Sequence, residues 1–195
     1  MVALGNPLAV HMAVHIVSMT LAAPFMVLAW RGFFSRADRP AREIPLAAAT
    51  VLQVVALWGW HTPSVLETAL ASPALHLAMQ LTLLASALLF WAAVFQATGS
   101  RRWRALFALL VTGKLFCLLG VLLVFAPRTL YALGAGSHFH GAAGSGLEDQ
   151  QLAGLLMITA CPLTYVLAGV VIAARWVIEL DTDPGAGAAA EPAAG

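Results

Sequence analysis

Two histidines and two methionines lie close together near the start of the chain, in the stretch LAVHMAVHIVSM at residues 8–19. His11 and His15 are four residues apart, so on a helix they share one face; Met19 continues that face and Met12 lies on its flank. Two imidazoles at this spacing can bind one metal ion, and thioether sulfur favours Cu(I) over magnesium or calcium. The set predicts copper chemistry rather than zinc chemistry, because zinc usually brings thiolates or carboxylates.

Two further histidines are candidate ligands for the same site. His61 ends the second apolar segment of the chain and His76 begins the third. A structural interpretation competes with this one, since a single histidine near a helix end is more often an interfacial polar residue. Met19 and Met157, each taken alone, are likewise more often packing residues than ligands.

The fifth apolar segment opens with polar residues, in EDQQLAGLLM at residues 148–157. Asp149 has two interpretations: an acidic residue favoured by a helix N-terminus, or a carboxylate that orients metal-bound imidazoles. Further along, one helical face carries mostly small side chains, which predicts close approach of another helix. That face consists of Gln150, Ala153, Gly154, Met157 and Cys161.

A glycine-rich segment between the fourth and fifth apolar stretches contains a third histidine pair, His138 and His140. Flexible histidines flanked by glycine can capture copper transiently. The commoner explanation of such a segment is a solvated connector. Both interpretations stay open at this level.

The elements that must position these residues are membrane-spanning helices. Of the 195 residues, 61% are hydrophobic and 10% are charged, and the mean hydropathy is +0.87, which excludes an ordinary soluble domain. Apolar runs of helical length predict an all-α integral membrane bundle, because only helices or closed barrels span a bilayer. We expect one domain over residues 1–178 with a disordered Ala/Gly/Pro-rich tail at 179–195, and five spans at about 8–30, 45–61, 75–96, 105–126 and 151–175.

The basic residues predict the orientation of these spans. They concentrate after the first, third and fifth spans, so the positive-inside rule places the N-terminus outside and the C-terminus in the cytoplasm. All six histidines then lie toward the outer face. The net charge of +1 is spread without forming a basic patch and indicates no nucleic-acid partner. The arginines that carry this argument are Arg31, Arg36, Arg39, Arg42, Arg101, Arg102, Arg104 and Arg175, with Arg128 alone on the opposite side.

Three other residues call for an interpretation. Lys114 is the strongly basic residue in the middle of a span, and we expect it to face the bundle interior because an ammonium is costly at that depth. Cys117 and Cys161 lie on different spans without CxxC spacing, so they indicate neither a disulfide framework nor a thiol metal site. Their expected role is packing.

Several short motifs together resemble the CtaG family of membrane proteins, which are assembly factors for caa-type cytochrome c oxidases. The motifs occur in the same order as in that family and touch four of the five expected spans. They are HMAVH (11–15), AAPF (22–25), WGWHTP (58–63), LH (75–76) ahead of LLFW (88–91), and EDQQLAGLLM (148–157).

The resemblance implies a multi-spanning protein of the bacterial inner membrane that helps to form the copper centre of the oxidase by handling copper at the outer face. It implies no catalytic turnover, and its partners would be the oxidase subunit that carries the copper centre and a periplasmic copper donor. The family's functional positions fall on His11, His15, His61, His76, Asp149 and Gln150. The sequence departs from the family at Gln80, where a second histidine is common, and has fewer spans than usual.

Two other classes of function compete with a copper-binding assembly factor. Histidines on neighbouring helices can supply axial ligands to a b-type haem, as in a membrane electron-transfer protein. A small transporter or a structural subunit would use the same polar residues to line a water-filled mouth, although five spans do not divide into two repeats. Sequence alone also leaves open whether a homodimer shares one site.

Overall fold

The computed structural model describes residues 7–34, 43–131 and 146–182, and every element within these ranges is helical. The all-α prediction is therefore confirmed for the described part of the chain. The elements are α1 (Pro7–Ile16), the π-helical η1 (Val17–Ala22), α2 (Ala23–Phe34), α3 (Leu46–Trp60), α4 (Pro63–Ala71), α5 (Pro73–Gln96), the 3₁₀ turn η2 (Gly99–Arg101), α6 (Arg102–Phe125) and α7 (Gly146–Thr182).

Within the described residues, four stretches are long and apolar enough to cross a membrane, over residues 7–33, 73–96, 99–125 and 146–179. The expected count of five is not confirmed. The expected second span corresponds to α3, which has 15 residues and extends for about 22 Å, short of a roughly 30 Å hydrocarbon layer. Directly after it the chain forms α4, a helix that the sequence pattern did not predict. α4 begins at Pro63, and the first turn of a helix tolerates proline.

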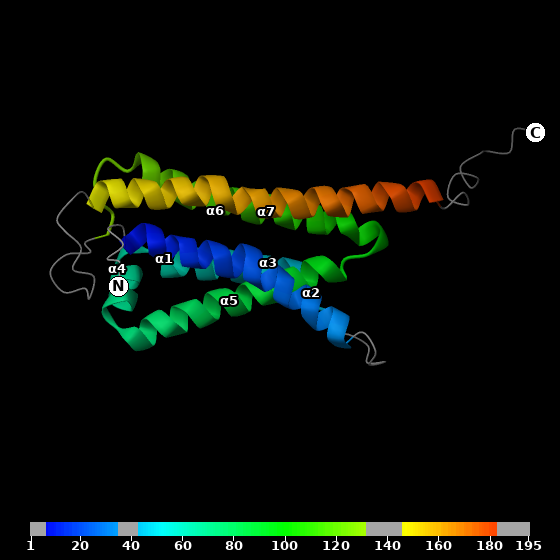
Figure 1. Cartoon of the computed structure of the whole chain (residues 1–195), viewed down its shortest axis with the longest axis horizontal. Helices are drawn as coiled ribbons and strands as arrows, with labels where there is room; N and C mark the ends of the chain where they lie inside the picture. The colour runs from blue at the N-terminus through cyan, green and yellow to red at the C-terminus, as the bar shows by residue number, and fades with distance from the viewer. Residues whose placement is uncertain (1–6, 35–42, 132–145, 183–195) are drawn as a thin grey trace, which may run out of the picture.

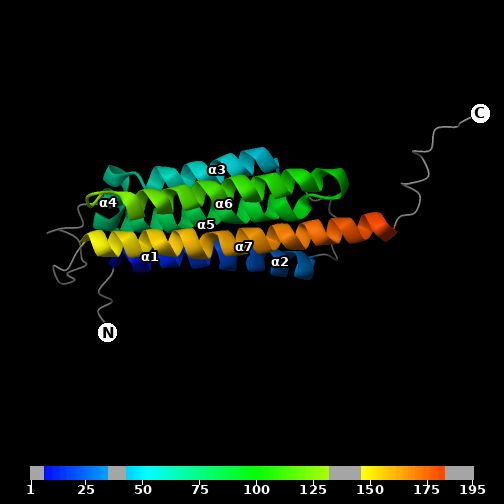
Figure 2. The same cartoon turned by 90° about the horizontal axis from the view of Figure 1, so that it is seen from above.

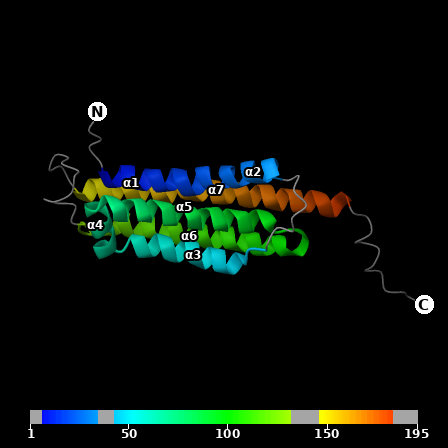
Figure 3. The ribbon, with the colours of Figure 1, turned by 90° about the horizontal axis from the view of Figure 1, so that it is seen from below.

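The helices run roughly along one axis, with α4 placed across one end of the bundle (Figure 1). α7 packs mainly on α6 and then on α1, while α5 packs on α3, α2 and α4. The beginnings of α1 and α7 and the end of α3 lie at the same end of the bundle, beside α4 (Figures 2 and 3). The chain therefore brings its histidine-bearing segments to one end, whereas the predicted outward orientation of that end stays a prediction.

The first span widens into a π-helical turn just after His15. The amide of Ala23 bonds the carbonyl of Ser18, one residue further back than in an α-helix. Pro24 has no N–H, so the carbonyl of Met19 loses its helical donor. The indole N–H of Trp91 on α5 donates to that carbonyl instead, at 2.9 Å, and so anchors the wide turn to a neighbouring helix.

α6 and α7 touch through their backbones in the half of the bundle that contains the histidines. A Cβ added to Gly154 would lie 2.6 Å from the carbonyl oxygen of Gly120, and one added to Gly120 would lie 2.9 Å from that of Gly154. Only glycine at both positions permits this approach. The predicted small face of the fifth span is confirmed, because its other members Gln150, Ala153, Met157 and Cys161 are all buried.

Two expectations about the same pair of helices need correction. α7 continues to Thr182, past the expected domain boundary at 178, so the first residues of the tail expected at 179–195 are helical, and the rest of that tail lies outside the described residues. Lys114 is exposed on the outside of the bundle rather than facing its interior. Its neighbours Gly113 and Phe116 are among the buried residues of α6, so the helix turns another face to the interior and leaves Lys114 outside.

Candidate metal centre

Three buried imidazoles meet at the histidine-bearing end of the bundle. His11 and His15 come from α1 and His61 caps the end of α3. One ring nitrogen from each residue lies within 4.8 Å of the other two, and each residue is at most 7% exposed. This three-histidine cluster is therefore a group that could bind a metal ion.

The ring of His61 is held in one tautomer by its own helix. Its Nδ1 lies 2.7 Å from the carbonyl oxygen of Leu57, and since a carbonyl only accepts, Nδ1 carries the proton. The other nitrogen, Nε2, is then a free lone pair, and it is buried without a hydrogen-bond partner. An imidazole oriented in this way by a backbone carbonyl is the usual form of a metal-ligating histidine.

His11 and His15 are in direct contact. Their Nε2 atoms are 2.8 Å apart, so in the absence of a metal one nitrogen donates a hydrogen bond to the other. The Nδ1 atom of His15 is also buried without a partner. A buried nitrogen without a hydrogen-bond partner is costly. Two such nitrogens in one cluster are explained if the cluster binds a metal ion, which accepts lone pairs from imidazole nitrogens.

His76 lies beside the cluster but outside its tightest group. Its ring centre is 5.5 Å from that of His11, and it begins α5, where it is only half-buried. Its Nε2 lies 3.2 Å from the side-chain nitrogen of Gln80 one turn later. The structure therefore brings all four predicted histidines together, three of them in mutual contact and His76 at the rim.

A small cavity lies directly beneath the cluster. Its volume is about 10 Å³, which is the space of one water molecule or ion. His15 and His61 line one part of it, and sulfur lines much of the rest. The sulfur-bearing residues are Met12, Met19, Met157 and Cys161, all at most 3% exposed. Met12, Met19 and Met157 thus lie at the predicted site, and Cys161, predicted as packing alone, joins them.

The side chain of Asp149 binds the backbone of α1, the helix that carries His11 and His15. Its two carboxylate oxygens accept hydrogen bonds from the amides of Leu8 and Ala9, at 2.8 and 3.0 Å. These amides belong to the first turn of α1, where no helical acceptor exists, and a negative charge is favourable there. The carboxylate therefore orients His11 and His15 by fixing the start of α1, through hydrogen bonds to backbone amides.

Two further polar side chains hold the segment that follows α6. Gln150 donates to the carbonyl of Leu123 at 3.1 Å and accepts from the amide of Leu130 at 2.6 Å. Tyr131 donates from its hydroxyl to the carbonyl of His61 at 2.9 Å. Burial raises the pKa of the Tyr131 phenol to about 12, so it remains a donor at neutral pH.

Sequence reasoning missed Tyr131, because a single tyrosine after a span looks like an ordinary interfacial residue. It also missed Trp91, whose indole anchors the π-helical turn below His15. Only the fold pairs these residues with segments 70 or more positions away. The predicted capture residues His138 and His140 lie outside the described residues.

Comparison with known proteins gives one finding. A family model described as cytochrome c oxidase caa3 assembly factor (Caa3_CtaG) matches residues 4–179. No curated protein and no solved structure gives a significant match. The matched range includes every residue of the three-histidine cluster and of the cavity beneath it.

Proposed function

The chain belongs to the cytochrome c oxidase caa3 assembly factor family, and from this premise we propose that it binds Cu(I) and supplies it to the copper centre of an oxidase. The observation that carries the proposal is the convergence of three imidazoles, one with its Nε2 lone pair buried and unpaired. The ligands would be His11, His15 and His61, with His76 at the rim.

The surroundings of the cluster favour copper among the metals that imidazoles bind. Zinc sites usually include thiolates or carboxylates beside histidine, whereas the carboxylate of Asp149 is engaged by two backbone amides. Three thioethers and one thiol line the cavity beneath the rings. Soft sulfur ligands select Cu(I), so Met12, Met19 and Met157 would stabilise the monovalent ion.

The same geometry disfavours the haem alternative. Two axial histidines must lie on opposite sides of a porphyrin, with a flat slot between them. His11 and His15 instead touch each other, and the neighbouring cavity is about 10 Å³. A macrocycle would require these helices to separate. The small-transporter and structural-subunit alternatives differ from the proposal in predicting no stoichiometric copper.

The family and the membrane helices support a setting for this function. The cluster would lie toward the periplasmic face of a bacterial inner membrane, where it would receive copper from a periplasmic donor and pass it to the oxidase subunit that carries the copper centre. Copper is then a cargo rather than a resident cofactor. The role requires no catalysis by the chain, because ligand exchange moves the ion between binding sites.

Metal binding by purified full-length protein tests the proposal. The protein is loaded with Cu(I) without oxygen and then titrated with a colorimetric Cu(I) chelator. We expect the wild type to bind about one copper per chain. The single variants His11→Ala, His15→Ala and His61→Ala should each bind Cu(I) at least about a hundredfold more weakly, because each lacks one of a small number of ligands. His76→Ala should weaken binding less.

Thr112→Val is the matched control, because Thr112 is fully buried in α6 but lies outside the cluster and the cavity. It should retain the copper of the wild type. Equal copper retention by the wild type and the three alanine variants would overturn the proposal. A haem absorption band at unit occupancy, or protein that binds neither copper nor haem, would favour the alternatives.

A further inference from the structure

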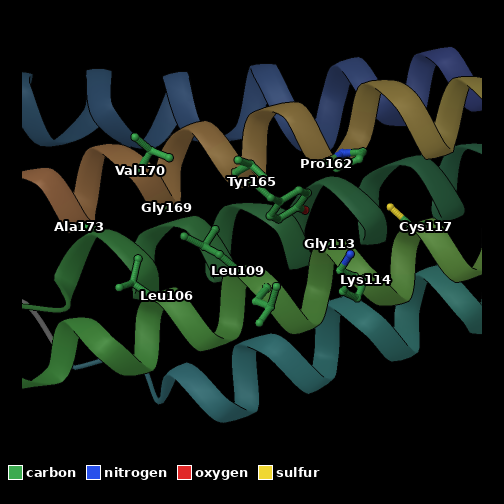
Figure 4. A pocket seen from close by; sticks show the side chains of 12 residues that line it. Leu106, Leu109, Gly113, Lys114, Cys117, Pro162, Tyr165, Gly169, Val170 and Ala173 are labelled. Carbon is green, nitrogen blue, oxygen red and sulfur yellow. The ribbon is translucent and has the colours of Figure 1, made fainter.

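A second polar feature lies on the outside of the bundle, between α6 and α7. A groove of about 330 Å³ there is lined almost entirely by apolar and small side chains, together with Lys114. Figure 4 shows Lys114 and Cys117 extending from α6 on one side, and Pro162 and Val170 from α7 on the other. The groove is separate from the histidine cluster, with which it shares no lining residue.

Lys114 lies near the middle of a membrane-spanning helix. It is about 18 Å along the axis from Arg102 and about 17 Å from Phe125, which are the two ends of α6. The four-carbon stem of lysine falls short of half the roughly 30 Å hydrocarbon layer. The ammonium therefore cannot reach a membrane surface without distorting the bilayer, and an unpaired charge at this depth is costly.

No residue of the described ranges gives this ammonium a hydrogen bond or an ion pair. By contrast, two arginines near the membrane ends of the described chain form ion pairs, Arg101 with Glu43 at 2.9 Å and Arg102 with Glu179 at 2.7 Å. Lys114 is exposed and its groove is open, so its counter-charge has to come from outside the residues that the structure describes.

α7 is also the least covered of the four spans. Only 17% of its most apolar window is buried, against 44% in each of the other three. Large aliphatic side chains on its second half are exposed, among them Val166 at 62% and Val170 at 59%. Acyl chains would satisfy these side chains, but they would leave the ammonium of Lys114 without a counter-charge.

We propose that the groove between α6 and α7 docks a transmembrane helix of another membrane protein, and that a carboxylate at mid-membrane depth on this helix pairs with Lys114. Charge complementarity identifies the partner, because opposite charges attract strongly where water is excluded. A second copy of this chain does not fit. Every Asp and Glu of the chain lies at or beyond a span end, and a symmetric pair would bring two Lys114 side chains together.

Designed transmembrane peptides test the proposal with full-length protein in phosphatidylcholine vesicles. A leucine–alanine peptide carries glutamate, glutamine or leucine at its centre, and its association with fluorescently labelled protein is measured by energy transfer. We expect the glutamate peptide to bind the wild type at least about tenfold more tightly than the leucine peptide. Lys114→Leu should abolish this preference, and Lys114→Glu should restore association with a peptide that carries a central lysine.

A matched control moves the charge to another helix. Ala85 is exposed near the middle of α5, so Ala85→Lys in the Lys114→Leu background presents a mid-membrane ammonium without the groove. This variant should show no preference for the glutamate peptide. An equal preference there, or equal binding of all three peptides by the wild type, would overturn the proposal. Loss of the preference on adding anionic lipid would show that it reflects the surface charge of the bilayer rather than an ion pair inside it, and would also overturn the proposal.

Copper binding distinguishes failure of this inference from failure of the proposed function. Lys114→Leu should retain the wild-type affinity for Cu(I), because Lys114 lines neither the cluster nor the cavity beneath it. Peptide docking should likewise survive His61→Ala.

Discussion

The three-histidine cluster and the Lys114 groove both place polar side chains within the membrane-spanning part of the molecule, but they differ in how these side chains are accommodated away from water. The histidines are buried, come from two separate segments and lie in contact with one another. Lys114 is exposed, stands alone and faces an open groove. Neutral imidazoles can share hydrogen bonds and a metal ion inside the bundle, whereas a single ammonium needs a counter-charge, which the described part of the chain does not supply.

The helix pair α6 and α7 shows why the two regions differ. Near the cluster, Gly120 and Gly154 allow the backbones to touch, and α7 is held there by Asp149 and Gln150. Around Lys114 and Val170 the same helices leave a groove. The close crossing lies beside the three-histidine cluster, and the open region is the one that we propose as a docking site for a partner helix.

Gly154→Val should push α6 and α7 apart beside the three-histidine cluster, where they are now in backbone contact. Its Cβ would lie 2.6 Å from a backbone oxygen of α6, so the helices must separate. We expect at least about 3 kcal/mol lower free energy of unfolding in mixed micelles, together with loss of Cu(I) binding. Gly59→Ala is the matched control, because nothing lies within 4 Å of an added Cβ at that position. If both variants were equally stable, close packing would not distinguish the two regions.

Asp149→Ala should loosen the cluster while leaving the groove intact. The amides of Leu8 and Ala9 would lose their acceptor, which costs about 2 kcal/mol for buried donors. Cu(I) affinity should fall by about tenfold as the start of α1 frays. Asp149→Asn retains an acceptor oxygen and should fall between alanine and the wild type. Full Cu(I) affinity in the alanine variant would show that α1 needs no anchor for the site.

Tyr131→Phe should cost about 1 kcal/mol of stability, because it removes one buried hydrogen bond to the carbonyl of His61. The pKa of Tyr131 is raised from about 10 to about 12 by burial. Its contribution is therefore complete below about pH 10 and is lost as the pH rises through about 12. Ultraviolet difference titration of the wild type against the variant would detect this ionisation. If Tyr131 ionised near pH 10, the ordinary pKa of a tyrosine phenol, its hydroxyl would be accessible to water and this prediction would be wrong.

Lys114→Leu should change the free energy of unfolding least, by no more than about 0.5 kcal/mol, because an exposed side chain without a partner makes few contacts to lose. The comparison is with Thr112→Val on the buried face of the same helix, measured in the same micelles. A loss of more than 2 kcal/mol, as expected for a broken buried pair, would show that Lys114 stabilises the fold itself.

Much of the candidate site could be predicted from local sequence. The four-residue spacing of His11 and His15 places them on one helical face whatever the helix packs against, and the small side chains around Gly154 predict a close helix contact. The position of His61 at the end of an apolar segment likewise follows from the sequence. These features depend on helical periodicity, which is a property of neighbouring residues.

Other features could not be predicted, because they depend on how distant helices pack. α3 reads as a membrane span by composition, yet it is a shorter helix that ends at His61 and is followed by α4. Lys114 was expected inside because charge avoids lipid, but which face of α6 points inward is decided by the fit of Gly113 and Gly120 against α7.

The sequence by itself therefore determined that the chain is a helical membrane protein, which family it resembles and which histidines are candidate ligands. Only the tertiary structure decided that His61 reaches the pair on α1, that Asp149 binds the amides at the start of α1, and that Cys161 joins the methionines beneath the rings. The physical reason is that periodicity and hydropathy act along one helix, whereas a ligand site requires contacts between helices far apart in the chain, and these depend on packing.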